Sequence, residues 1–596
     1  MWPFTTPYPE VRIDQLFDEY DYIVVGGGTA GCVLANRLSA PQTGAPPTRV
    51  LLIERGPVAD TWASRVPLFS SDFASDGTRT LRRRMEPQPA LGGRTLEAYS
   101  GGVLGGTSRI NQMLYARGLP GEYERWGVEA GVEGWGWEDV RGLFLKSEKA
   151  DVGVEGVHST GGVWKNRTHT EFYFKGFKEA VAAAEDIGLP YIPDVNSPTQ
   201  PPFGCARLHF TIDESAHRHS TYHAFLPKPL VLERQREGRL HVCTGAIVER
   251  LVTERTEEGV LVVTGVVVGP TMEGKGGSGR KVSRTVKVGK EVVLSAGPFG
   301  SPQILMLSGI GPAEHLKEHG ITVIKDLPAV GSNLQDHFGV SVGFNINMWD
   351  SLLSLEKRPW RFIIELVRYL IWGTGLLLVP VLQLAIFTHS KLLDSRGLPT
   401  KAEKAFDETL PDIEIMPMAY ESSDSAVGQY IPRTAGSFSF LNVLLAPVSR
   451  GTVRLTSPDP RAPLAIDPAY LSNPADLAPL RAAVKLSLRL RDRMRERGYA
   501  MRDATVPKSE EDADLDAWIR TCNRTTYHYT STCRMGKMDD EQWEGGAVVD
   551  ERLRVYGVRG LRVADSSVFP WVPRTHTQAP TVVVAEKCAE MILSGL

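Results

Sequence analysis

The amino-acid sequence predicts an α/β fold, α+β over the whole chain, that begins with a Rossmann-like nucleotide-binding domain. Residues 20–38 read YDYIVVGGGTAGCVLANRL, in which a short apolar strand meets glycines in GxGxxG spacing and a helical repeat follows. A second apolar run, at 50–53, ends in Glu54. The length of 596 residues is the third observation, because it suggests several units merged into intertwined domains.

The composition excludes several classes of protein. Apolar residues make up 42% of the chain and charged residues 23%, which is ordinary for a globular protein with a sizeable core. The net charge of -3 gives no reason to expect a nucleic acid as partner. The six cysteines include no CxxC pair, so they indicate neither a disulfide framework nor a zinc ribbon. Cys522, His528 and Cys533 are close in sequence, but their spacing fits no structural zinc pattern and no metal site is expected.

Each glycine of the first motif has a separate physical role. Gly26 allows the tight turn, Gly28 lets backbone amides approach a pyrophosphate, and Gly31 lets the helix pack on the strand. Thr29 and Ala30 begin that helix, whose N-terminus faces the anionic phosphates. Glu54 lies about 20 residues further on, where a carboxylate accepts hydrogen bonds from a ribose diol. The residues so far leave open whether the nucleotide is NAD or FAD.

Three further stretches carry a family resemblance. They read GGVLGGTSRINQMLYARG at 101–118, GPFGSPQILMLSGIG at 297–311 and VGSNLQDH at 330–337. With these motifs the chain resembles the glucose-methanol-choline (GMC) oxidoreductases, FAD-dependent enzymes that act mostly on alcohols. The resemblance runs from about Tyr20 to the C-terminus. It departs from the family pattern at Gly102, where a basic residue is usual.

The resemblance implies an FAD site and its residues. Small side chains in the 101–118 stretch suit close contact with a flat ring, and Asn111 can donate to ring carbonyls. Some family members attach FAD to a histidine just before this asparagine, but the residue here is Ile110, which implies a noncovalent flavin. Besides the glycine motif and Glu54, the residues expected at the cofactor are Val103, Gly106, Thr107, Asn111, Val248 (near the adenine), Asp565, Ser566 and Thr577.

Two histidines are the candidate catalytic residues. His528 lies in TTYHYTSTCRMG at 525–536, and His576 precedes a predicted helix that contains Pro580 near its start. In the family, the corresponding segments converge over the flavin. A neutral imidazole can take the hydroxyl proton as hydride leaves the alcohol carbon, and a second can hold the oxygen. We expect His528 to be the base and His576 its hydrogen-bonding partner, although the sequence also allows the reverse.

The resemblance also implies the domain organisation. Residues 18–337 are expected to form the FAD-binding domain, with an excursion into the substrate domain near 150–230. Residues 338–540 are expected to form a substrate-binding domain with an antiparallel sheet capped by helices, and 541–596 to return to the first domain. A helix is predicted at 477–497 and an exposed loop at 269–281.

One segment raises the question of a membrane. Residues 369–390 contain no charged side chain, a length that could span a bilayer. Gly373, Gly375 and Pro380 interrupt the segment, so a buried or partly exposed apolar stretch is the favoured interpretation. Residues 360–372 fit an amphipathic helix, and contact with a membrane surface is a less favoured alternative. The N-terminus lacks the pattern of a signal peptide, so an intracellular, cytoplasmic location is expected.

The expected function is FAD-dependent oxidation of a small-molecule alcohol to an aldehyde or ketone, with O2 or another oxidant as electron acceptor. The apolar stretch favours a lipophilic or aromatic alcohol. The alternative is a lyase or cyclase of the same family, with little net redox change, in secondary metabolism. Family members that decarboxylate fatty acids under light are disfavoured, because Leu445 stands where they carry a cysteine. Substrate identity, the choice between oxidase and dehydrogenase, and the oligomeric state stay open.

Overall fold

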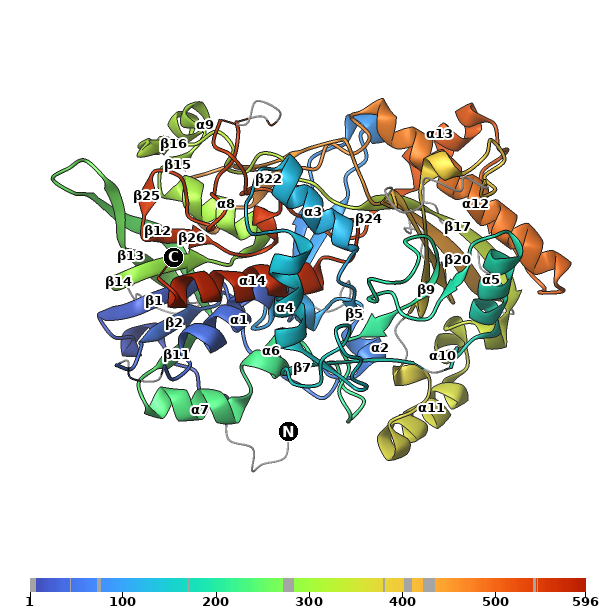
Figure 1. Ribbon diagram of the computed structural model, residues 1–596, viewed down its shortest axis with the longest axis horizontal. Coiled ribbons are helices and arrows are strands. Elements are labelled where there is room, and N and C mark those ends of the chain that lie inside the picture. The colour runs from blue at the N-terminus through green and yellow to red at the C-terminus, as the bar shows by residue number, and fades with distance from the viewer. Residues whose placement is uncertain are drawn as a thin grey trace.

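The computed structural model describes residues 7–595 except 43, 45, 72–76, 170, 272–282, 379–380, 401–409, 422–434, 540–542 and 544. Two large sheets lie at opposite ends of its long axis (Figure 1). The predicted α/β fold is confirmed. The predicted exposed loop at 269–281 lies mostly outside the described residues, and the domain boundaries stay a prediction.

The first sheet has a parallel centre built from the predicted nucleotide-binding strands. β1 (Glu19–Val25) lies between β2 (Val50–Ile53) and β14 (Arg284–Leu294), and β11 (Leu240–Cys243) continues the parallel order beyond β2. β2 is buried along its whole length, as is typical of a parallel strand covered on both faces. α1 (Thr29–Leu38) packs against α14 (Gln578–Leu593), so the two ends of the chain share one layer.

An antiparallel extension widens this sheet. β14 pairs with β13 (Leu261–Pro270), which in turn pairs with β12 (Ala246–Arg255). These strands cover the valine-rich region of the sequence. Two short C-terminal strands, β25 (Val558–Arg559) and β26 (Leu561–Val563), pair in parallel with β13 and β14. The C-terminal segment therefore returns to the first sheet.

The second sheet is largely antiparallel. Its strands run in the order β23 (Arg502–Thr505), β17 (Phe338–Asn347), β20 (Ala435–Leu444), β19 (Ile413–Met418), β18 (Leu384–Thr388), β9 (Gly204–Arg207) and β8 (Tyr191–Ile192), and β24 (Asn523–Thr525) also pairs with β17. The predicted helix at 477–497 is α12 (Leu477–Glu496), which packs on β20. Two further helices, α5 (Lys175–Asp186) and α13 (Asp512–Cys522), pack against α12.

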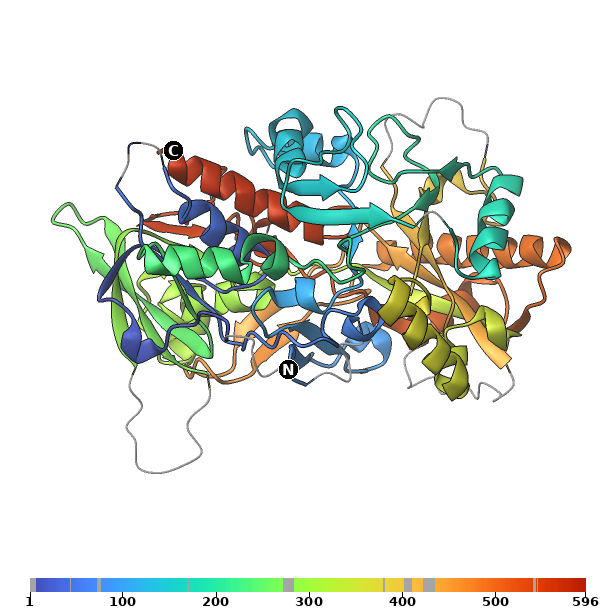
Figure 2. The same cartoon turned by 90° about the horizontal axis from the view of Figure 1, so that it is seen from below.

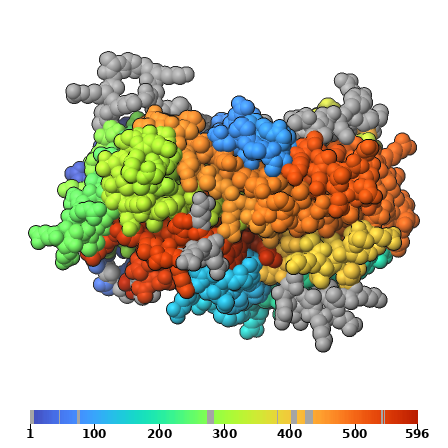
Figure 3. Space-filling model, turned by 90° about the horizontal axis from the view of Figure 1, so that it is seen from above, coloured from blue at the N-terminus to red at the C-terminus, as the bar shows by residue number. Residues whose placement is uncertain are grey.

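Smaller elements join the two parts. In the view from above, the blue segment around the short turn η2 (Pro89–Leu91) lies beside the orange surface of α13 (Figure 3). The remaining strands are β3 (Thr80–Arg84), β4 (Glu97–Gly101), β5 (Leu114–Tyr115), β6 (Glu148–Ala150), β7 (Trp164–Thr168), β10 (His209–Phe210), β15 (Ile310–Gly311), β16 (Lys325–Asp326), β21 (Thr452–Leu455) and β22 (Leu464–Asp467). The remaining helices are α2 (Pro67–Ser70), α3 (Pro120–Glu129), α4 (Trp137–Ser147), α6 (Thr221–Phe225), α7 (Lys228–Arg236), α8 (Gly297–Leu307), α9 (Ala313–Glu318), α10 (Leu353–Lys357) and α11 (Pro359–Trp372).

The apolar stretch at 369–390 is not one continuous element. It contains the end of α11, the 3-10 turn η5 (Leu376–Leu378) and the fully buried strand β18. Gly373 ends α11 with a φ of 60°, a left-handed conformation that glycine adopts at little cost. Within the described residues, no helix is long and apolar enough to cross a membrane.

A buried ion pair links the helices at the two ends of the chain. Arg37 of α1 donates two hydrogen bonds to Glu586 of α14, at 2.9 and 2.6 Å, and the Glu586 side chain is inaccessible to solvent. Removing the cation would leave a buried carboxylate with Lys146 Nζ, 3.2 Å away, as its remaining ionic partner.

We expect Arg37→Met to lower the free energy of unfolding by about 3 kcal/mol, because the buried Glu586 carboxylate loses both hydrogen bonds from the guanidinium and keeps only its contact with the partly exposed Lys146 among the described residues. Urea titration followed by circular dichroism measures this change. Arg12→Met is the matched control, since Arg12 pairs with Asp14 on the open surface, and it should leave the midpoint unchanged. Equal midpoints for Arg37→Met and the unmodified protein would contradict the prediction.

Candidate active site

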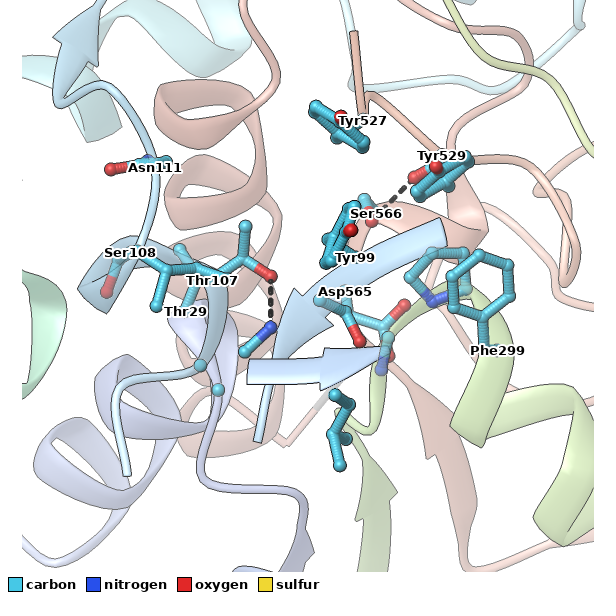
Figure 4. A pocket seen from close by; sticks show the side chains of 18 of the residues that line it. Thr29, Tyr99, Thr107, Ser108, Asn111, Phe299, Tyr527, Tyr529, Asp565 and Ser566 are labelled. Carbon is cyan, nitrogen blue, oxygen red and sulfur yellow. Dashed lines mark hydrogen bonds between the residues drawn. The ribbon is translucent and has the colours of Figure 1, made fainter. Parts of the chain in front are cut away.

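A large pocket lies where the two parts of the molecule meet. One side is formed by the β1–α1 turn, the end of β2 and the N-terminus of α8, all attached to the first sheet. The opposite side includes side chains of β19 and β20 from the second sheet. Figure 4 shows Thr29, Thr107, Ser108 and Asn111 along one side, and Phe299, Tyr529, Asp565 and Ser566 along the other.

The glycine motif forms one end of the pocket through close backbone packing. Gly26 has a φ of 100°, and a Cβ there would lie 2.5 Å from the carbonyl oxygen of Ser295. A Cβ at Gly31 would lie 1.9 Å from Gly26 O, so this glycine serves the packing of helix on turn. At Gly28 the nearest protein atoms would be 3.8 and 4.0 Å away, which are ordinary van der Waals distances, so a methyl group at the N-cap of α1 fits the protein itself. Gly28 and Thr29 line the pocket at this helix N-terminus, where backbone amides are suited to a phosphate.

Glu54 is fixed by backbone amides. Its two carboxylate oxygens accept hydrogen bonds from Gly27 N at 2.8 Å and Gly56 N at 2.7 Å. Burial raises the pKa of Glu54 to about 7, and these hydrogen bonds oppose the rise. The carboxylate therefore stays beside the glycine turn and lines the pocket, where a ribose diol could donate to it.

Two arginines that the sequence analysis did not identify also line the pocket. Burial lowers the pKa of Arg55, and it lowers that of Arg83 to about 10 with a further contribution from the Arg55 charge. The buried Nε of Arg55 has no hydrogen-bond partner among the described residues. Cations placed this way fit an anionic ligand such as a pyrophosphate. Arg83 is on β3, and no local motif indicated it.

The glycine at position 102, where the family pattern has a basic residue, has a steric explanation. A Cβ at Gly102 would lie 2.5 Å from Cγ of Leu81, so the Leu81 side chain fills the space that a side chain at position 102 would need. Leu81 and Arg83 both come from β3 and line the pocket. The strand thus supplies an apolar contact at position 102, and two residues further along it Arg83 brings a cation to the pocket.

The remaining polar residues of the pocket hold its walls together. Asp565 accepts hydrogen bonds from Gly297 N and Ser301 Oγ, which fixes the first turn of α8. Asn111 does not point freely into the pocket: its Nδ2 donates to Gln578 Oε1, and its Oδ1 accepts from the buried Arg218 at 2.7 Å. Thr107 Oγ1 accepts a hydrogen bond from Gly101 N.

The two predicted catalytic histidines come together. His528 follows β24, His576 precedes α14, and their ring centroids are 5.0 Å apart at an interplanar angle of 88°. Both line the pocket. A third imidazole, His337, lies 5.1 Å from that of His528, with the two Nδ1 atoms 2.9 Å apart.

The contacts of His337 determine which ring nitrogen carries the hydrogen in His337 and in His528. Its Nε2 lies 3.1 Å from the carbonyl oxygen of Leu445, which can only accept, so Nε2 carries the hydrogen. Burial lowers the pKa of His337 to about 3 and that of His528 well below its usual value, so both rings are neutral near pH 7. His337 Nδ1 is then an acceptor, and His528 Nδ1–H donates to it. This leaves Nε2 of His528 without a hydrogen.

Asp336 holds the backbone of His528. Its Oδ1 accepts from His528 N at 2.7 Å, and its Oδ2 accepts from the hydroxyls of Tyr470 and Thr525, both at 2.5 Å. Burial raises the pKa of Asp336 to about 7. Asp336 and His337 both belong to the 330–337 motif, whose composition was noted in the sequence without a role for either residue.

His576 has an acidic partner from the second sheet. Its Nε2 lies 2.9 Å from Oε1 of the buried Glu414 on β19. Oε2 of this carboxylate has no hydrogen-bond partner among the described residues. Nothing near Glu414 in the sequence indicated this pairing, because 162 positions separate the two residues.

Most of the predicted site residues line this one pocket. The residues that do so are Gly26, Gly28, Thr29, Ala30, Glu54, Gly106, Thr107, Asn111, Val248, His528, Asp565, Ser566, His576 and Thr577. Gly31 and Val103 do not: Gly31 packs against the turn, and Val103 is buried beside it.

Comparisons with known proteins show which family the chain is similar to. Models of the GMC oxidoreductase family match residues 20–339 and 447–585. An uncharacterised GMC-type oxidoreductase of Mycobacterium tuberculosis is 35% identical over 96% of this chain and 99% of its own length. An oxygen-dependent choline dehydrogenase of Chromohalobacter salexigens is 30% identical over 96% and 95%. The crystal structure of pyridoxine 4-oxidase from Mesorbium loti superposes with a TM-score of 0.79, at 26% identity over 96% and 99%.

We expect Gly28→Ala to fold but to bind FAD at least tenfold more weakly, because a methyl group fits the protein there and fills the space left for a phosphate. Dissociation constants from fluorescence titration of the flavin-free protein measure the effect. Gly31→Ala is the contrasting variant, since its methyl group meets backbone at 1.9 Å and should impair folding itself. Unchanged FAD affinity in Gly28→Ala would contradict the assignment of this turn.

Proposed function

Because the chain belongs to the GMC oxidoreductase family, we propose that it oxidises a lipophilic or aromatic alcohol with His528 as the base. Members of this family are FAD-dependent and act on small-molecule alcohols with oxidants such as O2. The observation that carries the proposal is the hydrogen-bond chain from Leu445 O through His337 to His528, which leaves an unprotonated nitrogen beside the pocket.

The residues of the pocket fit a noncovalent FAD. The amides at Gly28 and the cations Arg55 and Arg83 suit the pyrophosphate, and Glu54 suits the ribose. Ile110, at the position where some family members carry the linking histidine, lines the pocket and offers no nucleophile. When bound, FAD supplies a two-electron acceptor for the hydride that leaves the alcohol carbon.

His528 removes the hydroxyl proton in this proposal. An alcohol cannot lose hydride easily while its oxygen keeps the proton, because a protonated carbonyl would form. His528 Nε2 has the lone pair needed, and the low pKa of this buried ring keeps it unprotonated well into the acid range. As Nε2 gains the proton, Nδ1 continues to donate to His337, so the ring keeps its orientation.

His576 holds the substrate oxygen. Its Nε2–H donates to Glu414, which fixes the ring and supplies a negative charge next to it. In this proposal the Glu414 carboxylate orients the ring so that its other nitrogen, Nδ1, meets the oxygen that becomes the carbonyl. A donor at that oxygen and an acceptor at the hydroxyl proton are the two functions that the reaction requires.

Apolar side chains line the part of the pocket formed by the second sheet, which supports a lipophilic or aromatic substrate. They are Leu382, Met416, Met418 and Leu441, and all four belong to a buried apolar cluster that surrounds this end of the pocket. Sugars would lose hydrogen bonds to water there without compensation, because such a wall offers few polar partners.

Anaerobic mixing of the flavin-loaded protein with alcohols tests the proposal. We expect aromatic and medium-chain aliphatic alcohols to bleach the oxidised flavin absorbance faster than glucose does. His528→Ala should keep the flavin spectrum and lower the rate of bleaching by about 10²- to 10⁴-fold, the usual contribution of a general base. Admission of air then separates an oxidase from a dehydrogenase. If flavin is bound and no alcohol reduces it, the lyase or cyclase alternative replaces the proposal.

A second prediction concerns the hydrogen-bond chain. His337→Leu removes the acceptor for His528 Nδ1–H, so the ring can adopt the other tautomer, and we expect kcat to fall about tenfold or more. His337→Gln can accept from His528 and donate to Leu445 O, so it should recover most of the lost rate. Stopped-flow reduction rates and Tm for both variants provide the comparison. Equal loss in the two variants at equal Tm would argue against control of the tautomer.

A further inference from the structure

Helix α11 has its apolar side outward, which is the reverse of the usual arrangement. Its two buried residues are both polar, Glu365 and Tyr369. Glu365 accepts from Leu376 N at 2.8 Å and from Arg368 at 3.1 Å, and Tyr369 OH donates to Ala216 O at 2.9 Å. Polar contacts thus fasten the helix to the body of the protein. A helix of a globular protein normally turns its apolar side to the core.

The outward side is a continuous apolar stripe, which we call the α11 stripe. Its residues from Trp360 to Ile371 recur every three or four positions and so share one side of the helix, and Trp372 follows them at the C-terminal end. The exposed fractions reach 58% for Ile363, 59% for Leu370, 64% for Ile371 and 63% for Trp372. The full stripe consists of Trp360, Ile363, Ile364, Val367, Leu370, Ile371 and Trp372. α11 lies at the outer edge of the molecule in both ribbon views (Figures 1 and 2).

The surroundings of the stripe fit the boundary of a lipid bilayer. Trp360 and Trp372 lie near the two ends of the helix, and Trp349 packs beside Trp360 with ring centroids 5.4 Å apart. Tryptophan prefers the headgroup level of a membrane, because its ring is apolar and its N–H is polar. Across 356–372 the basic residues outnumber the acidic ones: Lys357, Arg358, Arg361 and Arg368 stand against Glu356 and Glu365. This balance favours anionic headgroups.

The opposite, inner side of α11 is connected to the pocket. The inner side of α11, through Tyr369 and Leu366, packs into the same apolar cluster that contains Leu382, Met416, Met418 and Leu441 of the pocket wall. Leu377 and Leu378, just beyond the end of the helix, belong to this cluster. Apolar side chains therefore extend without a break from the base of α11 to the site where an alcohol would bind.

A second copy of the chain fits the stripe less well than a lipid surface. A stable dimer buries about 800 Å² on each partner through 20–30 residues. One helix of 14 residues, about 21 Å long, presents a narrow ridge with seven apolar side chains. A ridge of this width is suited to insertion between headgroups, with the basic residues beside it at headgroup level.

We propose that α11 docks this protein on an anionic membrane surface by inserting the α11 stripe at the headgroup boundary. Where the proposed function holds, docking brings the apolar side of the pocket next to the lipid phase in which a lipophilic alcohol is dissolved. The binding itself rests on the exposed stripe and its flanking charges alone, so it can be tested without any turnover.

Sedimentation with lipid vesicles tests the proposal. Flavin-loaded protein should pellet with vesicles of phosphatidylcholine and phosphatidylglycerol (3:1), and less with pure phosphatidylcholine or in high salt. The variant Ile363→Gln/Val367→Gln/Ile371→Gln should bind at least tenfold more weakly. These side chains are exposed, so Tm and the flavin spectrum should not change. Val128→Gln/Val152→Gln, which replaces exposed valines elsewhere (82% and 67%), should bind like the unmodified protein.

Three results would overturn the proposal. One is protein that stays in the supernatant with both kinds of vesicle. The second is a triple variant that binds vesicles as well as the control does. The third is a dimer, detected by light scattering, that the triple substitution converts into a monomer, because the stripe would then be a protein interface. Oxidation of a water-soluble aromatic alcohol should be equal in all variants. If no alcohol is oxidised while vesicle binding follows the stripe, the proposed function fails and the docking stands.

Discussion

Close backbone contact between segments that are distant in sequence is the constraint on which the rest of the structure depends. The β1–α1 turn approaches the end of β14 so closely that a Cβ at Gly26 would lie 2.5 Å from Ser295 O. Gly56 meets Gly102 O in the same way, and Gly106 meets Gly28. These glycines let four segments converge without side chains between them. The resulting surface presents amides and leaves room for a flat, phosphate-bearing ligand.

The chemistry of the site is arranged in layers around His528. Asp336 fixes its backbone, His337 fixes its ring, and Leu445 O fixes His337. The ring of His528 itself contacts a neutral imidazole, which suits the proposed role of a base that must stay uncharged before the reaction. His576 differs, because it pairs with the carboxylate of Glu414. The two imidazoles thus have different partners, a neutral ring for His528 and a carboxylate side chain for His576.

The second sheet contributes both chemistry and access. β19 carries Glu414 toward His576 and also Met416 and Met418 toward the pocket. Because side chains alternate along a strand, these three residues lie on the same face of the sheet, although Glu414 is charged and the methionines are apolar. The same apolar cluster reaches α11 at the surface. The apolar wall of the pocket, the partner of His576 and the base of α11 are therefore parts of one packed unit.

The sequence by itself determined the nucleotide-binding elements, because GxGxxG spacing, the terminal Glu54 and the apolar strands are local patterns whose geometry follows from backbone sterics. It also indicated the family, and the motifs around His528 and His576 marked both as candidate catalytic residues. Only the tertiary structure placed Glu414 on His576, His337 on His528 and Arg83 in the pocket, since each contact joins different elements across long stretches of chain. The sequence also left open which side of α11 faces outward. Periodicity defines an apolar stripe on a helix, but packing decides which side of the helix faces the core.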